Sequence, residues 1–152
     1  MKQKKLAQNS YFFQMLLILF LVAVDQITKY LAFLFEVSTQ GFFFLQISEN
    51  KGSAFSIFSS ITWYNEIIII LSILIFILGS YYCIKKHQIE SQLELVAYLL
   101  FGAGLIGNLI DRILFDYVRD FIGITYFAIF NIADVYLCIS VALLIYCEYK
   151  KK

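Results

Sequence analysis

An uncharged apolar segment at residues 67–84 is the feature that most limits how this chain can fold. It is close to the length of about 20 apolar residues that a helix needs to cross the hydrocarbon core of a bilayer. Three other stretches, at residues 11–35, 95–110 and 131–146, are similarly apolar with few interruptions. The sequence therefore predicts an all-α membrane protein with four transmembrane helices, organised as a single domain over residues 1–152.

The composition agrees with several membrane spans. The chain is 61% hydrophobic and 15% charged, with a mean hydropathy of +0.79, whereas soluble domains are about half apolar and a quarter charged. A basic start followed by an apolar run is also typical of a cleavable signal peptide. Because the apolar run continues through residues 30–35, we favour a retained first span. The net charge of +1, with Lys and Arg dispersed, indicates no nucleic-acid partner.

The connection between the first two expected spans has the character of a small β-rich region. Strand-like pieces at residues 42–47 and 54–58 flank the turn-prone sequence SENKGS. Aromatic side chains are frequent in this connection, as they are at membrane interfaces. The sequence therefore predicts a β-rich extracytoplasmic region between the first and second helices.

The distribution of Lys and Arg predicts the orientation in the membrane. An even number of spans puts both termini on one side, together with the link between the second and third spans. That side carries eight Lys residues and the other side four basic residues, so the positive-inside rule places both termini in the cytoplasm. The remaining unusual polar residues then meet at the extracytoplasmic face: Asp25, Lys29, Asn50, Asn108, Asp111, Arg112, Asp120, Asn131 and Asp134.

Two pairs of opposite charges lie close together in the sequence. Asp25 and Lys29 are four residues apart, so on a helix they share a face and can pair, either as an interfacial anchor or in support of a site. Asp111 and Arg112 are expected to form a structural ion pair, although Arg112 could instead tether another carboxylate. Asp116 falls in a polar connection and is expected to be solvated.

Asp120 and Asp134 are the remaining candidates for chemistry. Taken singly, Asn131 and Asp134 can be read as the N-cap and a first-turn acid of the last helix. Taken together, two carboxylates that share a site hold one proton over a wide pH range. The ionised member can then take a proton from water while the protonated member polarises a scissile carbonyl. No HExxH metal motif competes with this reading, and His87, the only histidine, is expected on the cytoplasmic side.

With these residues in place, the chain resembles the bacterial signal peptidase II family, the lipoprotein signal peptidases, which are membrane aspartic proteases. The resemblance covers nearly the whole chain. It is carried by five short motifs in the family's order: DQITK (25–29), NKGSAF (50–55), GNLIDR (107–112), VRDF (118–121) and FNIAD (130–134).

The resemblance implies a role for each matching residue. Asp120 and Asp134 would be the catalytic pair. Prolipoproteins would be cleaved on the amino side of a diacylglyceryl-modified cysteine, at the outer face of the bacterial cytoplasmic membrane, without a metal or other cofactor. The expected partners are diacylated prolipoproteins and membrane lipids, and the expected state is a monomer. Substrate binding or site shaping would fall to Asn50, Gly52, Asn108, Arg112 and Asn131, with Asp25, Lys29 and Asp111 in support.

The chain also departs from the family pattern. Leu105 stands where a Gly-Gly-Ala run usually precedes the Gly-Asn pair, and Arg119 occupies a position that is often apolar. Ala128 replaces a common proline, and the segment from Asp120 to Asp134 looks shorter than usual. These departures leave the pair of acids intact and bear on the packing near Leu105 and the shape of the outer loop.

Three alternatives remain open from the residues themselves. A small membrane ligand-binding protein or transporter subunit would use the same polar cluster without catalysis. A membrane transferase would use carboxylates to hold a divalent metal, and chelators would inactivate it. A protease that cuts within a span would need a GxGD motif, which the sequence does not contain.

Overall fold

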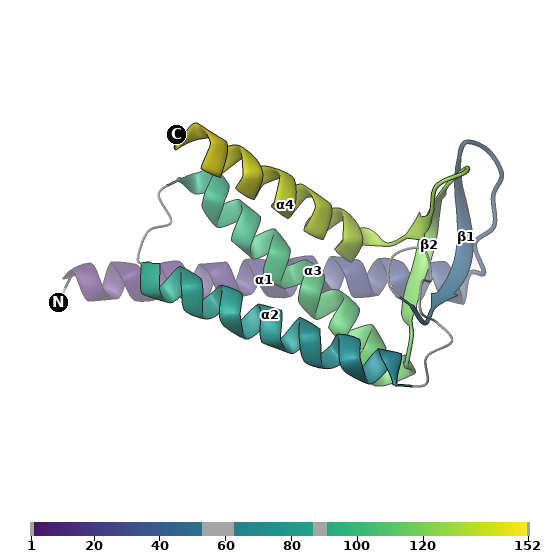
Figure 1. The fold of residues 1–152 in the computed structure, drawn as a ribbon, viewed down its shortest axis with the longest axis horizontal. Coiled ribbons are helices and arrows are strands. Elements are labelled where there is room, and N and C mark those ends of the chain that lie inside the picture. Colours follow the sequence, from purple (N-terminus) through teal and green to yellow (C-terminus); the bar gives the residue numbers. More distant parts are fainter. Residues whose placement is uncertain (1, 53–62, 87–90, 152) are drawn as a thin grey trace.

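The protein is a bundle of long helices with a small sheet at one end. The computed structural model describes residues 2–52, 63–86 and 91–151. The helices run side by side, the sheet lies at one end of the bundle, and both ends of the chain lie towards the other (Figure 1). The elements follow in the order α1 (Lys2–Leu34), β1 (Phe43–Asn50), α2 (Tyr64–Lys86), α3 (Gln92–Phe115), β2 (Val118–Ile124), β3 (Ile129–Phe130) and α4 (Ile132–Lys150).

Three helices of the described chain are long and apolar enough to cross a membrane. They are Tyr11–Leu34 within α1, Gln92–Phe115 and Ile132–Lys150. These match the first, third and fourth expected spans. The second expected span corresponds to α2, whose described apolar part, Asn65–Gly79, is shorter.

The sheet differs from the predicted β-rich region in its origin. Its order is β1-β2-β3, all antiparallel. Only β1 comes from the connection between α1 and α2, because β2 and β3 both lie between α3 and α4. Ser48 to Asn50, read from the sequence as part of a turn, are the end of β1. The strand-like piece expected at 54–58 lies outside the described residues.

An irregularity in β1 aligns the end of this strand with Asp120. The pairing with β2 shifts between Leu45 and Ser48, so that Ser48 lies opposite Asp120 and Asn50 opposite Val118. Residues 48 and 50 share one face of the strand, and diagonal neighbours across two strands are within reach of each other. The side chain of Asn50 can therefore reach the carboxylate of Asp120.

Small residues let α3 approach its neighbours closely. A Cβ atom at Gly104 would lie 2.7 Å from the backbone oxygen of Ala133, and one at Gly107 would lie 2.6 Å from Oδ2 of Asp25. A side chain at either position would push α4 or α1 away. The small-residue pattern thus brings three helices together at the end of the bundle that faces the sheet.

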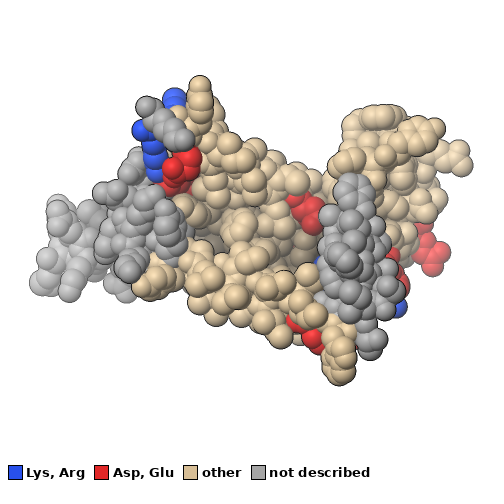
Figure 2. Space-filling model, in the orientation of Figure 1, with Lys and Arg blue, Asp and Glu red and all other residues tan. Residues whose placement is uncertain are grey.

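The interior of this bundle holds a large group of polar side chains beside its apolar ones, and its outer surface is apolar. The largest fully buried side chains include Lys29, Asp25, Asp111, Asp120 and Asn131, whereas many large apolar side chains are exposed along the helices. In Figure 2 uncharged residues cover the middle of the helical part, and charged residues lie towards its ends. Polar side chains inside and apolar side chains outside are the arrangement that a lipid environment favours.

Candidate active site

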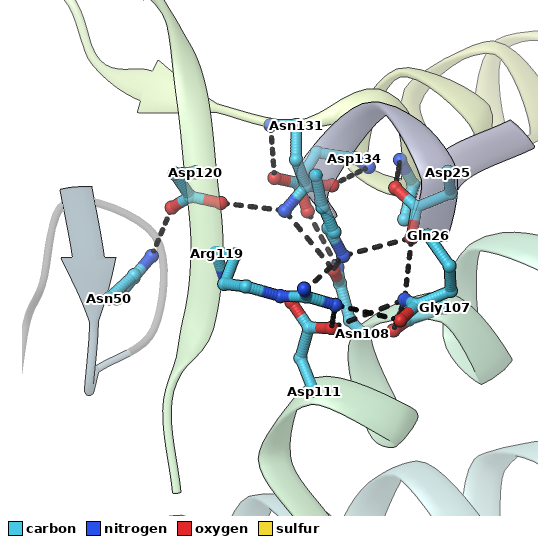
Figure 3. Close-up of polar contacts among 12 residues, drawn as sticks. Asp25, Gln26, Asn50, Gly107, Asn108, Asp111, Arg119, Asp120, Asn131 and Asp134 are labelled. Atoms are coloured by element: carbon cyan, nitrogen blue, oxygen red, sulfur yellow. Dashed lines mark hydrogen bonds and ion pairs between the residues drawn. The ribbon is translucent and has the colours of Figure 1, made fainter. Parts of the chain in front are cut away.

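Most of the buried polar residues, together with several half-buried ones, form one continuous network where the helices meet the sheet. Figure 3 shows side chains from α1, α3, α4 and both longer strands pointing toward one another. Each candidate residue named from the sequence can be placed relative to this network: Asp25, Lys29, Asn50, Gly52, Asn108, Asp111, Arg112, Asp120, Asn131 and Asp134.

Four charged groups form the base of the network. Nζ of Lys29 lies 2.9 Å from Oδ2 of Asp25 and 3.3 Å from Oδ2 of Asp111, and all three side chains are fully buried. Nη2 of Arg119 lies 2.8 Å from Oδ1 of Asp111. We call Asp25, Lys29, Asp111 and Arg119 the ion cluster. Two carboxylates and two cations in this arrangement compensate one another, as buried charges require.

The ion cluster confirms one predicted pair and corrects the other. Asp25 and Lys29 pair as expected from their spacing. The ion pairs of Asp111 are with Lys29 and Arg119, in place of the predicted Arg112. Adjacent residues on a helix point in directions about 100° apart, so Asp111 faces the interior while Arg112 points elsewhere. Nη2 of Arg112 donates to the backbone oxygen of Gly52 at 3.0 Å.

Asp25 also connects the ion cluster to α4. Its Oδ1 accepts a hydrogen bond of 2.9 Å from the backbone N–H of Ala133, in the first turn of that helix. A carboxylate at a helix N-terminus satisfies one of the free N–H groups and interacts favourably with the helix dipole. Asp25 therefore fixes the position of the helix that carries Asp134.

Gln26 is a member of the network that the sequence reasoning missed. Its Nε2 donates to Oδ2 of Asp25 at 3.1 Å, to the backbone oxygen of Gly107 at 3.0 Å and to Oδ1 of Asp111 at 3.2 Å. Its Oε1 accepts from Nη2 of Arg119 at 2.8 Å. The available signal was an amide between two charged residues in an apolar helix, which in a membrane protein needs partners.

Asn108 links the ion cluster to Asp134, and its neighbours fix which way its amide points. Its Oδ1 accepts from Nζ of Lys29 at 3.0 Å and from Nδ2 of Asn131 at 3.1 Å. Its Nδ2 then donates to Oδ1 of Asp134 at 2.8 Å. The opposite orientation would place an NH₂ group against the lysine ammonium, which has only donors. Lys29 therefore directs the NH₂ group of Asn108 at the carboxylate.

Asn131 joins the two candidate catalytic acids directly. It is the N-cap of α4, and it forms a capping box with Asp134: its Oδ1 accepts from the backbone N–H of Asp134, and its own N–H donates to Oδ2 of Asp134. Its Nδ2 donates to Oδ1 of Asp120 at 2.6 Å. Asn131 thus caps the helix, as the sequence predicted, and also binds both acids.

Asp120 completes the pair from β2. The side chain is 1% exposed, and its Oδ2 accepts from Nδ2 of Asn50 at 3.0 Å. The amide of Asn50 is itself oriented, because its Oδ1 accepts from the backbone N–H of Gly52. Burial, followed by repulsion from the Asp134 carboxylate, raises the pKa of Asp120 to about 7.

The geometry favours a pair of carboxyl groups that carries one proton near neutral pH. Each carboxyl group accepts hydrogen bonds from donors that other contacts hold in place, and these bonds stabilise the ionised form of one group. Ionisation of both would place two negative charges in a buried space. Asp116, by contrast, is exposed and ends α3 in a left-handed conformation, with φ of 63°.

The family model and the relatives that match this chain all describe the same kind of enzyme. A family model described as signal peptidase (SPase) II matches residues 17–150. A lipoprotein signal peptidase of Bartonella henselae is 35% identical over 92% of this chain and 90% of its own length. One from Streptococcus pyogenes serotype M5 is 35% identical over 89% of this chain and 91% of its own length.

Solved structures extend the similarity to the fold. Two chains described as bacterial membrane enzymes, solved in meso at 2.3 Å and 1.9 Å resolution, each superpose with a TM-score of 0.80. The first is 34% identical, with 91% of this chain and 88% of that chain covered. The second is 33% identical, with 92% and 94% covered.

Proposed function

This chain belongs to the signal peptidase II family, and we propose that it cleaves prolipoproteins with Asp120 and Asp134 as its catalytic pair. Membership makes it a membrane signal peptidase, and the relatives are lipoprotein signal peptidases. The proposed substrates are prolipoproteins that carry a diacylglyceryl-modified cysteine. The proposed cleavage site is the peptide bond on the amino side of that cysteine.

One observation supports the catalytic pair above all others. A single residue, Asn131, contacts the carboxylates of both acids, donating to Asp120 from its side-chain Nδ2 and to Asp134 from its backbone N–H, although these acids come from a strand and a helix. Asp120 is buried and Asp134 is half-buried, so an isolated charge on either carboxyl group would be costly. Two acids held together by one residue, with directed donors around them, have the arrangement that aspartic peptidase chemistry requires.

The proposed mechanism uses the single proton of the pair twice. The ionised carboxylate takes a proton from water as the water oxygen attacks the scissile carbonyl carbon, and the protonated carboxyl gives its proton to the carbonyl oxygen. The resulting tetrahedral diol then collapses. One hydroxyl returns its proton to the pair, the amide nitrogen receives the other carboxyl proton, and the carbon–nitrogen bond breaks. The products are a carboxylic acid and an amine, and the pair again holds one proton.

The end of β1 is the proposed contact for the extended substrate peptide. Asn50 and Gly52 form a tight turn beside Asp120, closed by the bond from the Gly52 N–H to Oδ1 of Asn50. Arg112 holds the same turn from α3 through the Gly52 carbonyl. An extended chain running past this turn would bring its carbonyl group to the catalytic pair, with the lipid chains of the cysteine remaining among the membrane lipids.

The proposed topology has four spans, with both termini in the cytoplasm and the site near the extracytoplasmic face of a bacterial cytoplasmic membrane. In support, the sheet and the polar network lie at the end of the bundle remote from both chain ends (Figure 1). The spans would include α2 as well as the three longer candidates. A first span that is retained is also favoured, because α1 supplies Asp25, Gln26 and Lys29 to the network.

A cleavage assay with purified protein tests the proposed activity. We expect one cut in a diacylated precursor, with mass spectrometry placing the new amino terminus at the modified cysteine. The same precursor without the lipid should remain uncut. Cleavage at another bond, or binding of the precursor without any product, would contradict the proposal, and the second result would favour a ligand-binding protein.

A chelator arm of the same assay tests the proposed absence of a metal. In the described parts of the chain, no three His, Cys, Asp or Glu side chains converge as metal ligands would. Because the proposed pair activates water with its own carboxyl groups, addition of EDTA should leave the rate of cleavage unchanged. Loss of activity in EDTA, with recovery on adding a divalent cation, would favour metal-dependent chemistry instead.

A further inference from the structure

Arg119 takes no direct part in the proposed reaction, yet its guanidinium is almost entirely buried next to the site. Its Nη2 donates to Oδ1 of Asp111 and to Oε1 of Gln26, each at 2.8 Å. Its Cζ lies 4.5 Å from the centre of the Phe115 ring. Successive residues of a strand point to opposite faces, so this side chain leaves β2 on the face away from Asp120. A buried cation that touches no reacting group needs another explanation.

The explanation lies in the charge of the ion cluster. Without Arg119, the carboxylates of Asp25 and Asp111 would share the single ammonium of Lys29. With it, two carboxylates meet two cations, and the cluster is neutral. Any residual charge in this cluster would act strongly on nearby ionisable groups, because the interior screens charge far less than water does.

The ion cluster is in contact with the catalytic pair along two paths. Lys29 donates to Asn108, which donates to Asp134. Asp25 accepts from the backbone of Ala133, the residue that precedes Asp134. The charge of the cluster is therefore placed next to the pair, where it adds to or subtracts from the cost of ionising a carboxyl group.

We propose that Arg119 sets the pH range in which the Asp120–Asp134 pair carries one proton, by making the adjacent ion cluster electrically neutral. Arg119 is a positioning residue in this sense, because it acts through the cluster and not on the substrate. Removing its charge would leave a net negative cluster, and ionisation of the pair would then require a higher pH. The inference rests on the proposed function, since it assigns the pair its catalytic role.

The other charged groups around the pair do not cancel the effect of the Arg119 charge. Glu49 lies opposite Arg119 in the register of β1 and β2, but it is exposed, so water and salt screen its charge. Arg112 is bound to the backbone of Gly52 on the substrate side. The ionisable groups on the elements packed around the pair include Asp25 and Lys29 from α1, Glu49 from β1, Asp111 and Arg112 from α3, Arg119 from β2 and Tyr136 from α4.

Variants at two positions test the proposal through the pH dependence of kcat/KM. Arg119→Met keeps the length of the side chain and removes its charge, and it should move both limbs of the profile upward by about one pH unit. Arg119→Lys keeps the charge and should leave the profile in place. Asp111→Asn alone should move the limbs downward, and the double variant Arg119→Met/Asp111→Asn should return them towards the parent values.

A purely structural role for Arg119 predicts a different pattern. It would lower the melting temperature and the amount of active enzyme in Arg119→Met while both limbs stay at the parent pH. That result, or an equal shift in Arg119→Lys, would overturn the proposal. If Arg119→Met does not fold, the downward shift of Asp111→Asn relative to the parent decides the matter, and an unchanged profile there counts against the proposal.

A substrate-free readout separates this proposal from the proposed function. Titration of the Asp120 carboxyl by ¹³C NMR in detergent should show the same upward displacement in Arg119→Met. An enzyme that cleaves precursor with an undisplaced Asp120 titration would contradict the charge effect alone. A displaced titration in a protein that cleaves nothing would support the charge effect and contradict the proposed function.

Discussion

At the scale of single residues, the site is built from amides whose direction is fixed by groups other than the carboxylates of the proposed catalytic pair. Lys29 orients Asn108, and the backbone N–H groups of Asp134 and Gly52 orient Asn131 and Asn50. Each of these three amides then presents an NH₂ group to a carboxylate. Donors held in place before the reaction cost nothing to reorganise during it.

Removal of one such donor tests the value of this arrangement. Asn108→Leu eliminates the bond to Asp134, and a hydrogen bond to a charged group is worth about 1.5–3 kcal/mol. We expect kcat to fall by roughly 10- to 100-fold, measured as the rate of cleavage at saturating precursor. Asp116→Asn is the matched control, because Asp116 is exposed and asparagine tolerates its left-handed conformation. A control variant as slow as Asn108→Leu would contradict this account.

The ionisation of Asp120 predicts the alkaline limb of the activity. Burial and the neighbouring Asp134 raise the pKa of Asp120 to about 7, so the pair loses its remaining proton as the pH rises through that value. The rate should therefore decline above about pH 7, measured with a precursor whose own charge does not change in this range. A rate that stays constant through mildly alkaline pH would show that no proton on Asp120 is needed.

The same raised pKa affects stability with a definite sign. Asp120 binds its proton more tightly in the folded protein than in the unfolded chain, in which the pKa of an aspartate is about 3.9. The free energy of unfolding should therefore decrease as the pH rises from about 4 to about 7, and not change further from this group above that range. Asp120→Asn should remove this component of the pH dependence in thermal melts. Equal slopes for parent and variant would contradict it.

At the scale of elements, the fold depends on how closely α3 approaches α1 and α4. Gly107 leaves space for the Asp25 carboxylate, and Gly104 leaves space for the backbone of Ala133. The sheet in turn brings Asp120 toward Asp134, because β2 connects to α4 through the short strand β3. The helices therefore position three of the four members of the ion cluster, and the strand β2 positions Arg119 and Asp120.

Glycine-to-alanine variants along α3 test this packing. A Cβ at Gly107 would lie 2.6 Å from Oδ2 of Asp25 and 3.2 Å from Cβ of Ala133, so Gly107→Ala should displace the carboxylate that holds α4. We expect a marked fall in the melting temperature and a loss of activity. Gly102→Ala is the control, because its nearest atoms would lie at 3.7 Å and 3.9 Å, an ordinary contact. Equal melting temperatures for the two variants would contradict the packing argument.

The sequence predicted the long helices and many of the polar residues, and it failed where contacts depend on tertiary structure. Apolar runs predicted four spans, three of which are candidate spans in the described chain, and spacing on a helix predicted the Asp25–Lys29 pair. The strand β2 was not predicted because it is buried on both faces, including at Arg119 and Asp120, so it lacks the alternation of a half-exposed strand. The prediction that Asp111 pairs with its neighbour Arg112 was also wrong, because Asp111 pairs with Arg119 of β2.

At the scale of the whole molecule, the polar interior and apolar exterior define where the reaction can occur. The network lies at the end of the bundle where helices give way to the sheet (Figures 1 and 3). The proposed lipid-modified substrate would approach this site from the side while its lipid chains stay in the bilayer. The opposite end of the bundle is tied by an ion pair of 3.3 Å between Lys151 and Glu94.

The proposed orientation can be tested by labelling in intact cells. Single cysteines at Tyr126, which is fully exposed in the loop between β2 and β3, and at Tyr149, exposed near the end of α4, lie at opposite ends of the molecule. In a background without the native cysteines, an impermeant maleimide should label Tyr126→Cys in intact cells and Tyr149→Cys only after lysis. Labelling of both positions before lysis would contradict four spans with cytoplasmic termini.

The most direct test of the central claim is cleavage of a diacylated precursor under single-turnover conditions by Asp120→Asn and Asp134→Asn. Each variant keeps the size of the side chain and removes the shared proton chemistry. Both variants should bind the precursor, melt as cooperatively as the parent protein and form no product. Cleavage at a rate near that of the parent by either folded variant would contradict the assignment of Asp120 and Asp134 as the catalytic pair.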